Sequence, residues 1–369
     1  MAVVAASVLV AIGTATGTIK ALDEGRGADR ARPEASDATL LLPLPDVPSS
    51  LSNSPSAKAS SSTRPKRTAA PSGRKPQRTA TDSPRLYRHP DSQVLDWVRA
   101  HPDDPRTEVI ASRIADEPAA VWFADFTPST ITSRVRAVTA GAAAQGRVPV
   151  VVPYAIPERD CGGASEGGAP DFAAYDGWID DFAAGLGSGE VVVILEPDSV
   201  AQTDCLSDAQ RADRFAALAR AGRVLKAADP KARVYYDAGH SDWNPAAQQA
   251  ALLRQAGAAS DGSSDGIFSN VSNFNGTSAE IAYDRQVLDA LGGPAGLGAV
   301  VDTSRNGNGA PADGQWCDPA GRKIGRAPTL DTGEARIDGY LWVKLPGESD
   351  GCKGAAGTFT ASYAYDLAR

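Results

Sequence analysis

Short apolar runs recur seven times between residues 119 and 343, and they limit the possible folds more than any other feature of the sequence. The runs alternate with stretches in which apolar residues recur at helical spacing. Because the runs are apolar almost throughout, we expect both faces of each strand to be buried, as in a parallel sheet covered by helices. The runs occupy residues 119–124, 148–154, 191–195, 232–236, 266–269, 297–301 and 340–343.

The stretch 207–228 illustrates the helical pattern, with Phe215 and Leu218 on one face and Arg211 and Lys226 on the other. The predicted fold class is therefore α/β. About seven alternating strands and helices suit either a distorted (β/α) barrel or a doubly wound sheet, and the pattern alone leaves both open.

The first 85 residues differ in composition from the rest. Residues 1–20 are mostly small and apolar, which is typical of a signal peptide or a signal anchor, although no basic residues precede them. Residues 21–85 are rich in Ser, Pro, Ala and Arg without a regular period, which predicts a disordered linker. We therefore expect a secreted, extracellular protein, and an anchor in the membrane or the cell wall stays open.

Net charge and cysteine spacing exclude several classes of partner. The formal net charge of −8 argues against nucleic acid, because phosphate binding needs a surplus of Lys and Arg. The four cysteines form two separate couples, Cys161 with Cys205 and Cys317 with Cys352, and two disulfides are favoured over four reduced thiols. The cysteines lack a metal-binding spacing and the three histidines are scattered, so we expect no metal and no other cofactor.

Nearly every apolar run ends in polar or aromatic residues, and in a barrel of parallel strands these ends meet on one face, where substrates bind. The run 191–195 is followed by Glu196 and Asp198, whose side chains project to the same side if strand geometry continues. We assign Glu196 a structural hydrogen-bonding role and place Asp198 at the open mouth of the substrate site. Capping of the following turn is the alternative for Asp198. Four more acids follow such runs: Asp160, Asp237, Glu348 and Asp350.

This group of acids indicates proton-transfer chemistry. Like charges held close raise the pKa of one member, which can then donate a proton at neutral pH. Arg159, Arg305 and Lys344 would keep the other members ionised. Two acids of unequal proton affinity are what cleavage of a glycosidic bond requires.

Aromatic residues at the same strand ends favour a sugar substrate. Trp122, Trp243 and Trp316 lie in or just beyond polar ends, where a flat indole can carry the apolar face of a sugar ring. Core packing is the alternative, which we prefer for Trp178 and Trp342.

One motif points to a different chemistry. Residues 163–167 match GxSxG, in which Ser165 would be a nucleophile and His240 its base. Such a serine lies directly at a strand-to-helix turn, whereas six residues, 156–161, intervene here. We therefore reject a serine esterase.

Six blocks of the sequence resemble glycoside hydrolase family 6, the cellulases that include endoglucanases and cellobiohydrolases. The resemblance covers residues 86–369, which we take as the catalytic domain. The blocks are YAIPERDC at 154–161, VILEPDS at 193–199, YDAGHS at 236–241, DTSRNGNG at 302–309, WCDP at 316–319 and WVKLPGESDGC at 342–352.

The resemblance implies a distorted β/α barrel that hydrolyses β-1,4-glucan with inversion at the anomeric carbon. Asp198 matches the general acid of the family, Asp160 the carboxylate that raises the pKa of this acid and helps to order the water, and Asp350 a base or base-linked acid. The resemblance also implies the two cysteine pairings. The residues expected to contact the sugar chain are Trp122, Tyr154, Ser165, Asp237, His240, Trp243, Asn273, Trp316, Lys344 and Glu348.

The sequence departs from the family pattern at one position. A serine that holds the catalytic water commonly follows the aspartate of RDC by six residues, but that residue is Glu166 here, and Ser165 lies one position early. We assign the role to Ser165, because a shift of the loop by one residue would restore it.

The segment between Cys317 and Cys352 lacks the long insertion of a tunnel-forming enzyme, so we predict an endoglucanase with an open groove. We expect a monomer whose partner is a β-1,4-glucan polysaccharide. The alternatives are an exo-acting cellobiohydrolase and a catalytically weak homologue that binds glucan at the cell wall.

Overall fold

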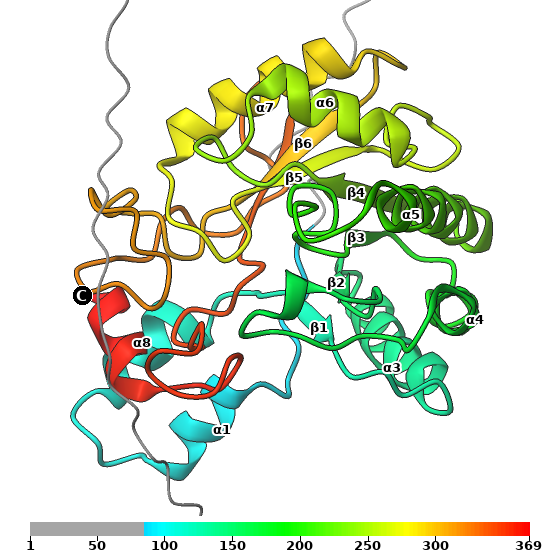
Figure 1. Ribbon diagram of the computed structural model, residues 1–369. Helices are drawn as coiled ribbons and strands as arrows, with labels where there is room; N and C mark the ends of the chain where they lie inside the picture. Colours follow the sequence, from blue (N-terminus) through cyan, green and yellow to red (C-terminus); the bar gives the residue numbers. More distant parts are fainter. Residues whose placement is uncertain (1–84) are drawn as a thin grey trace, which may run out of the picture. The chain divides into compact units, whose positions relative to one another are not determined.

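The structure, a computed structural model, describes residues 85–369, so the predicted segment 1–20 and all but the last residue of 21–85 lie outside the described residues. Seven parallel strands form one curled sheet in the order β1 to β7 (Figure 1). The predicted α/β fold with about seven parallel strands is confirmed. The strands are β1 (Val121–Phe123), β2 (Val150–Pro153), β3 (Val191–Leu195), β4 (Ala232–Asp237), β5 (Gly266–Ser269), β6 (Gly298–Asp302) and β7 (Ile337–Leu341).

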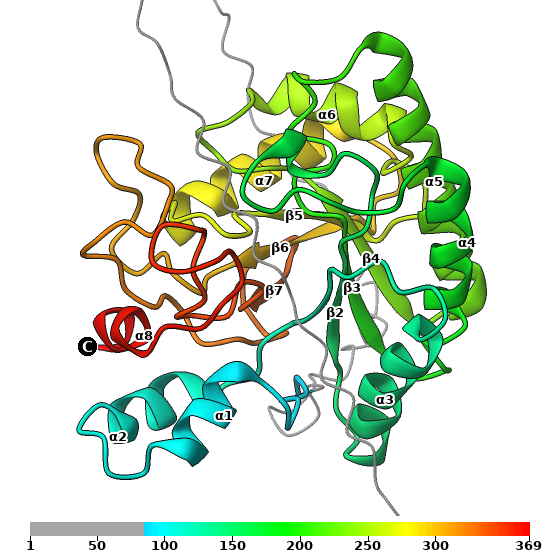
Figure 2. The same ribbon diagram turned by 60° about the horizontal axis from the view of Figure 1, so that its bottom comes forward.

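The sheet curls into a distorted, open barrel (Figure 2). Its first and last strands, β1 and β7, do not pair with each other. Two hydrogen bonds join the chain next to these strands. The N–H of Ala120 donates to the carbonyl of Trp342 at 2.9 Å, and the indole Nε1–H of Trp122 donates to the carbonyl of Val343 at 2.7 Å. The sequence pattern alone is compatible with a doubly wound sheet as well as a barrel. The observed curl of the sheet is that of the distorted barrel.

One strand differs from the prediction. β7 begins at Ile337, three residues before the predicted start, because the strand tolerates the polar Asp338. The carboxylate of Asp338 accepts a hydrogen bond from the hydroxyl of Tyr235 at 3.0 Å and lies against Gly298, where any side chain would collide with it. A polar residue inside a strand therefore hid its first half from pattern reading.

Five helices cover the outer face of the sheet (Figures 1 and 2). The longest, α5, spans Asp208–Ala228 and confirms the helix predicted at 207–228. It starts with a capping box in which Ser207 and Gln210 satisfy each other's backbone N–H groups. The other four are α3 (Ile131–Ala144), α4 (Phe172–Ala183), α6 (Ala246–Gln255) and α7 (Thr277–Leu291).

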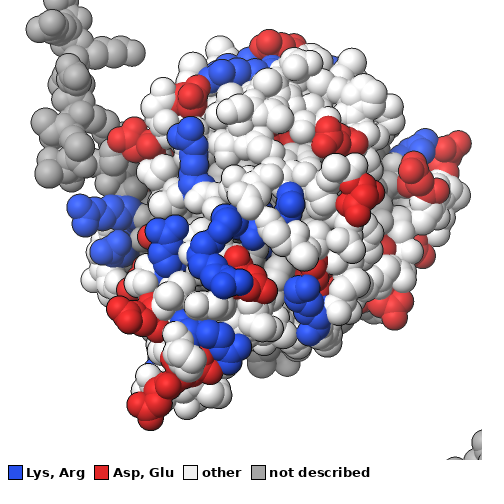
Figure 3. All heavy atoms as spheres, turned by 90° about the vertical axis from the view of Figure 1, so that its left-hand side faces the viewer, with Lys and Arg blue, Asp and Glu red and all other residues white. Residues whose placement is uncertain are grey.

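A separate apolar cluster holds the two ends of the described chain together. Helices α1 (Gln93–Ala100), α2 (Thr107–Ile110), the π-helical turn η1 (Ala111–Ala115) and α8 (Ala361–Ala368) contribute its buried residues, and Trp342 joins them from the end of β7. On the face that carries α8, basic and acidic side chains lie interspersed (Figure 3). Within the described residues, no helix is both long and apolar enough to cross a bilayer.

Candidate active site

The turn after β3 carries the two acids that the sequence placed at the mouth of the site. Glu196 and Asp198 have φ angles of 49° and 69°, a region that residues other than glycine rarely occupy. Glu196 is fully buried, and its carboxylate accepts hydrogen bonds from the backbone N–H groups of Ala155 at 2.9 Å and Ile156 at 3.0 Å. The predicted structural role of Glu196 is confirmed, since it ties β3 to the chain beyond β2.

Asp198 receives no side-chain hydrogen bond from the residues that the structure describes, so its carboxyl group caps no turn there. Burial raises its pKa well above the ordinary value, and the neighbouring carboxylates of Asp237 and Asp160 raise it further. Asp198 is half-buried, and a carboxyl group without donors beside other acids favours its neutral form. This surrounding suits a proton donor.

Asp237, at the end of β4, lies beneath Asp198 and is only 2% exposed. Its carboxylate accepts hydrogen bonds from the N–H groups of Val200 at 3.1 Å, Ala201 at 2.8 Å and Gly239 at 2.9 Å. Burial raises the pKa of Asp237 too, but three donors favour its charged form, whereas Asp198 has none. The donors thus favour the charged form on Asp237 rather than on Asp198, and Asp237 holds the turn that carries Asp198.

Asp160 lies on a strained loop, residues 158–168, that follows β2. Glu158, Asp160 and Cys161 all have positive φ angles, of 53°, 55° and 48°. The Asp160 carboxylate accepts a hydrogen bond from the N–H of Ser165 at 2.7 Å, and the disulfide from Cys161 to Cys205 anchors the loop. Ser165 is half-buried and Glu166 is exposed, so the loop turns the serine toward the protein.

The side chain of Arg159 holds this loop in place. Its guanidinium donates hydrogen bonds to the carbonyl oxygens of Ala124 at 2.6 Å and Ser165 at 2.7 Å, and also to that of Tyr154. It lies 4.6 Å from the centre of the Tyr154 ring, within range of a cation–π contact. Arg159 therefore joins the Asp160 loop to the ends of β1 and β2.

Tyr154 connects the two acids in space. It is 6% exposed and packs edge-to-face against Trp122, with 5.2 Å between ring centres. Its pKa is raised by burial and then by the charges of Asp198 and Asp160. Both carboxyl groups act on the same phenol, so Tyr154 lies near both Asp160 and Asp198.

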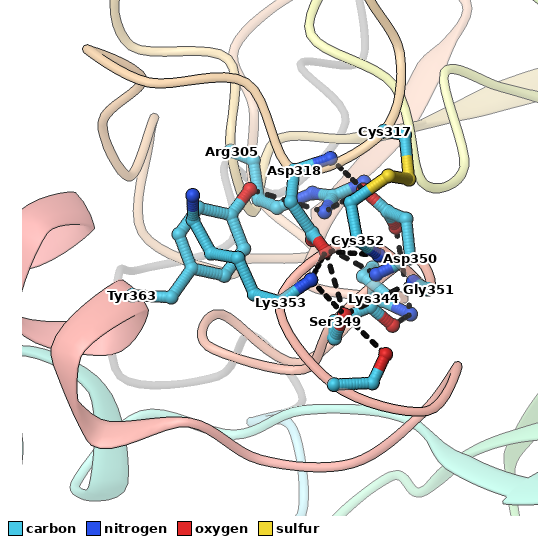
Figure 4. Close-up of a disulfide and its surroundings, with 11 residues drawn as sticks. Arg305, Cys317, Asp318, Lys344, Ser349, Asp350, Gly351, Cys352, Lys353 and Tyr363 are labelled. Atoms are coloured by element: carbon cyan, nitrogen blue, oxygen red, sulfur yellow. Dashed lines mark hydrogen bonds and ion pairs between the residues drawn. A yellow bond between two sulfur atoms is a disulfide. The ribbon is translucent and has the colours of Figure 1, made fainter.

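Asp350 lies on the loop after β7 in a cationic surrounding (Figure 4). The guanidinium Nη1 of Arg305, which is fully buried, lies 2.8 Å from Oδ2 of Asp350, and Nζ of Lys344 lies 3.7 Å from Oδ1. The backbone N–H of Asp318 donates to Oδ2 as well, at 3.1 Å. Asp350 thus has two cations and a backbone N–H as partners, in contrast to Asp198.

Asp318 organises the loop of Asp350, and sequence reasoning missed it although it quoted the WCDP block. Its carboxylate accepts hydrogen bonds from the hydroxyl of Ser349 at 2.6 Å and from the N–H groups of Asp350 at 2.8 Å, Cys352 at 3.0 Å and Lys353 at 2.8 Å (Figure 4). The neighbouring disulfide from Cys317 to Cys352 closes the same loop. The one sequence signal for this role is that Asp318 directly follows Cys317 in the WCDP block.

Lys344 and Glu348 lie beside Asp350. Nζ of Lys344 donates to the carbonyl of Ser349 at 3.1 Å, and burial lowers the pKa of Lys344. The carboxyl group of Glu348 accepts a hydrogen bond at 3.2 Å from the side chain of Gln93 in α1, and burial raises its pKa to about 7.

The loops of Asp160 and Asp350 approach each other. A depression of about 370 Å³ lies between Ala164 of the first loop and Gly351 of the second, and Trp316, which is 58% exposed, forms part of its wall. The two loops, which carry Asp160 and Asp350, therefore lie on the same side of the barrel.

The remaining predicted sugar contacts lie around the ends of β4 and β5. The rings of His240 and Trp243 are 5.3 Å apart, and both residues are half-buried. Asn273 is half-buried after β5, and its side-chain amide donates to the carbonyl of Val271 at 3.1 Å.

The family described as "Glycosyl hydrolases family 6" matches residues 82–368. The chain belongs to glycosyl hydrolase family 6. The family predicted from the six blocks is confirmed, and the chain is a glycoside hydrolase.

Its relatives within family 6 include bacterial proteins. The chain is 53% identical to "Endoglucanase 1" of Streptomyces sp. (strain KSM-9) over 291 residues, which are 79% of this chain and 79% of the relative. It is 50% identical to "Endoglucanase A" of Thermobispora bispora over 290 residues, 78% of this chain and 62% of the relative.

A solved family 6 structure carries a ligand. The endoglucanase Cel6 from Mycobacterium tuberculosis, in complex with methyl-cellobiosyl-4-deoxy-4-thio-β-D-cellobioside, is 40% identical, with a TM-score of 0.71. The match covers 78% of this chain and 97% of that one. This relative thus binds a cello-oligosaccharide derivative on the same fold.

Proposed function

We propose that this chain is an endo-β-1,4-glucanase that inverts the anomeric carbon, with Asp198 as its general acid. The observation that carries the proposal is the unequal pair formed by Asp198 and Asp237, in which three N–H donors serve Asp237 and none serves Asp198. An acid that is protonated at neutral pH beside ionised carboxylates is the group that cleavage of a glycosidic bond needs.

The reaction transfers two protons. The proton of Asp198 passes to the glycosidic oxygen while the bond from this oxygen to the anomeric carbon breaks. A water molecule adds to the same carbon from the opposite face of the sugar and gives its proton to a carboxylate. The product therefore has the inverted configuration. The carboxylate then releases its proton to solvent, and Asp198 regains one from solvent.

Asp160 suits the acceptance of that second proton better than Asp350 does. Its carboxylate has one hydrogen bond, from the N–H of Ser165, whereas Arg305 and Lys344 hold the charge of Asp350. A carboxylate paired with cations is a weak base. We assign to Asp350 the placement of Lys344 and Arg305, and to Asp160 with Ser165 the ordering of the water.

Endo action rests on three observations. The relatives at 53% and 50% identity are named endoglucanases, the segment between Cys317 and Cys352 has no long insertion, and Trp316 is exposed. An exposed indole at the edge of the site suits a long chain lying in an open groove. The substrate is then an internal β-1,4 bond of a glucan, held on Trp122, Trp243 and Trp316.

The test uses carboxymethylcellulose, with loss of viscosity measured beside release of reducing ends. We expect a steep fall in viscosity for few ends released, and none of either for Asp198→Ala. Release of ends without a fall in viscosity would indicate the exo-acting alternative. Binding of glucan without any release would indicate the catalytically weak one. Proton NMR of the first products distinguishes inversion, which yields the α-anomer, from retention.

We also propose that the chain is exported. Both disulfides are formed, and disulfides persist in oxidising compartments such as the extracellular space. Fractionation of the cells that make the protein, with an antibody against it, tests this. Recovery in the medium or on the envelope is expected, and recovery only in the cytoplasm would contradict it.

A further inference from the structure

His240 belongs to the turn that follows β4, three residues beyond Asp237. Its Nε2 atom makes no hydrogen bond to any residue among 85–369. The atom is also not fully buried, so a ligand can reach it. The ring of Trp243 lies beside it, 5.3 Å away between centres. The chemistry of His240 toward a ligand therefore depends on which ring nitrogen carries the hydrogen.

Two groups face the other ring nitrogen, Nδ1. The side-chain nitrogen Nδ2 of Asn275 lies 2.9 Å from it, and the backbone N–H of Asp242 lies 3.3 Å from it. A backbone N–H can only donate, so Nδ1 must present its lone pair. In a neutral imidazole the hydrogen is then on Nε2.

Asn275 is itself held rigidly. It is 5% exposed, its backbone N–H donates to Oδ1 of Asn270 at 3.0 Å, and its carbonyl accepts from Asn270 at 3.1 Å and from Asn306 at 3.0 Å. Its side-chain nitrogen Nδ2 also lies 3.3 Å from the hydroxyl of Ser241, and the backbone N–H of Ser241 donates to the fully buried carboxylate of Glu280 at 3.0 Å.

We propose that Asn275 and the N–H of Asp242 fix His240 as the Nε2–H tautomer, so that its ring donates a hydrogen bond to a sugar hydroxyl. Asn275 is a positioning residue in this arrangement, since it acts through His240. The identity of the ligand rests on the proposed function, whereas the tautomer is a property of the free protein.

The charged groups near His240 do not change this preference for the neutral Nε2–H tautomer. Asp242 on the same turn favours a charged ring, but burial lowers the pKa of His240. Glu280 of α7 accepts the backbone N–H of Ser241 and makes no hydrogen bond to the ring. A protonated ring would place an N–H against two donors. One neutral form therefore persists over the pH range in which the acid Asp198 works.

Nitrogen-15 NMR of the full chain with labelled histidine tests the proposal directly. The chain has three histidines, and His240→Gln identifies the signals of His240. We expect Nδ1 in the range of an unprotonated nitrogen and Nε2 in that of a protonated one, without change between pH 7 and mildly acid pH. A hydrogen on Nδ1, or averaging of the two nitrogens, would overturn the proposal.

Asn275→Asp reverses the polarity of the contact with little change of shape. The new carboxylate would draw a proton to Nδ1, so the His240 signals should shift to a charged ring at neutral pH. We expect kcat/KM on soluble glucan to fall roughly tenfold, the worth of one net hydrogen bond. Gln255→Glu, on the exposed side of α6, makes the same change of charge and should leave both spectrum and rate as in the wild type.

The outcomes separate this proposal from the function. An inactive wild type that shows the Nε2–H signals would refute the glucanase and leave the tautomer standing. An active enzyme whose His240 signals stay the same in Asn275→Asp would refute the role of Asn275. Loss of activity in Asn275→Asp with an unfolded spectrum is recognised by loss of the shift dispersion, and the wild-type spectrum alone then decides.

Discussion

Asp198 and Asp350 are carboxyl groups of one site in opposite surroundings. Asp198 has acidic neighbours and no hydrogen-bond donor among the described residues, whereas Asp350 has a buried arginine at 2.8 Å and a lysine at 3.7 Å. The first surrounding favours the neutral acid, and the second supplies a buried ion pair. The comparison teaches that the placement of donors, rather than the type of residue, decides which acid holds the proton.

Removal of the acid should have the largest effect. Asp198→Ala should lower the rate on carboxymethylcellulose by about 10²–10⁴, because the leaving oxygen is no longer protonated. A dinitrophenyl cellobioside, whose leaving group needs no proton, should lose far less. Initial rates on both substrates check this, with the exposed Asp213→Ala of α5 as the control. Equal losses on both substrates would show that Asp198 is not the proton donor.

Removing the arginine that pairs with Asp350 should lower the stability of the protein. Arg305→Met leaves the buried charge of Asp350 without its arginine and should lower the free energy of unfolding by about 3–5 kcal/mol. Arg336→Met, in the exposed pair with Asp289, should change little. Urea unfolding followed by circular dichroism measures both. A similar, small loss in the two variants would contradict a strong ion pair at Asp350.

The acidic side should also make stability depend on pH. Burial raises the pKa of Glu196 from 4.5 to about 7 in the folded chain. The folded state then binds the proton more tightly, so this stabilisation is complete below pH 4.5 and is lost as the pH rises toward 7. The loss amounts to about 3 kcal/mol. Urea unfolding over this range should show a shallower decline in Glu196→Gln, and an unchanged decline would refute the shift.

The smallest expected effect concerns the charge of Asp237 beside Asp198. Asp198 must be protonated to act, so activity falls as the pH rises through its pKa. Asp237→Asn removes a negative neighbour and should move this alkaline limb of kcat/KM down by about one pH unit. The pH profile, rather than the rate at the optimum, is the test. An unmoved limb would show that Asp237 serves only to hold the turn.

The sequence predicted the sheet well because its information is local. Apolar runs marked all seven strands. The largest part missed was the first half of β7, since Asp338 finds its partners in Tyr235 and Gly298 far along the chain. The ends of the runs placed Tyr154, Asp160 and Asp198 together for the same reason, since parallel strands end on one face.

The partners of these acids could not be read from the sequence. The four donors to Asp318 are mostly backbone N–H groups, and every residue but proline carries one. The contact between Asn275 and His240 spans 35 residues of chain. The sequence therefore names the acids, while the folded loops determine their protonation.

Difference infrared spectroscopy of the wild type against Asp198→Asn tests the central claim most directly, because a protonated carboxyl group and a carboxylate absorb at separate frequencies. The account predicts that at neutral pH the substitution removes a band of a protonated carboxyl group, and that Asp350→Asn removes a carboxylate band instead. A carboxylate band lost on substitution of Asp198 at neutral pH would contradict it.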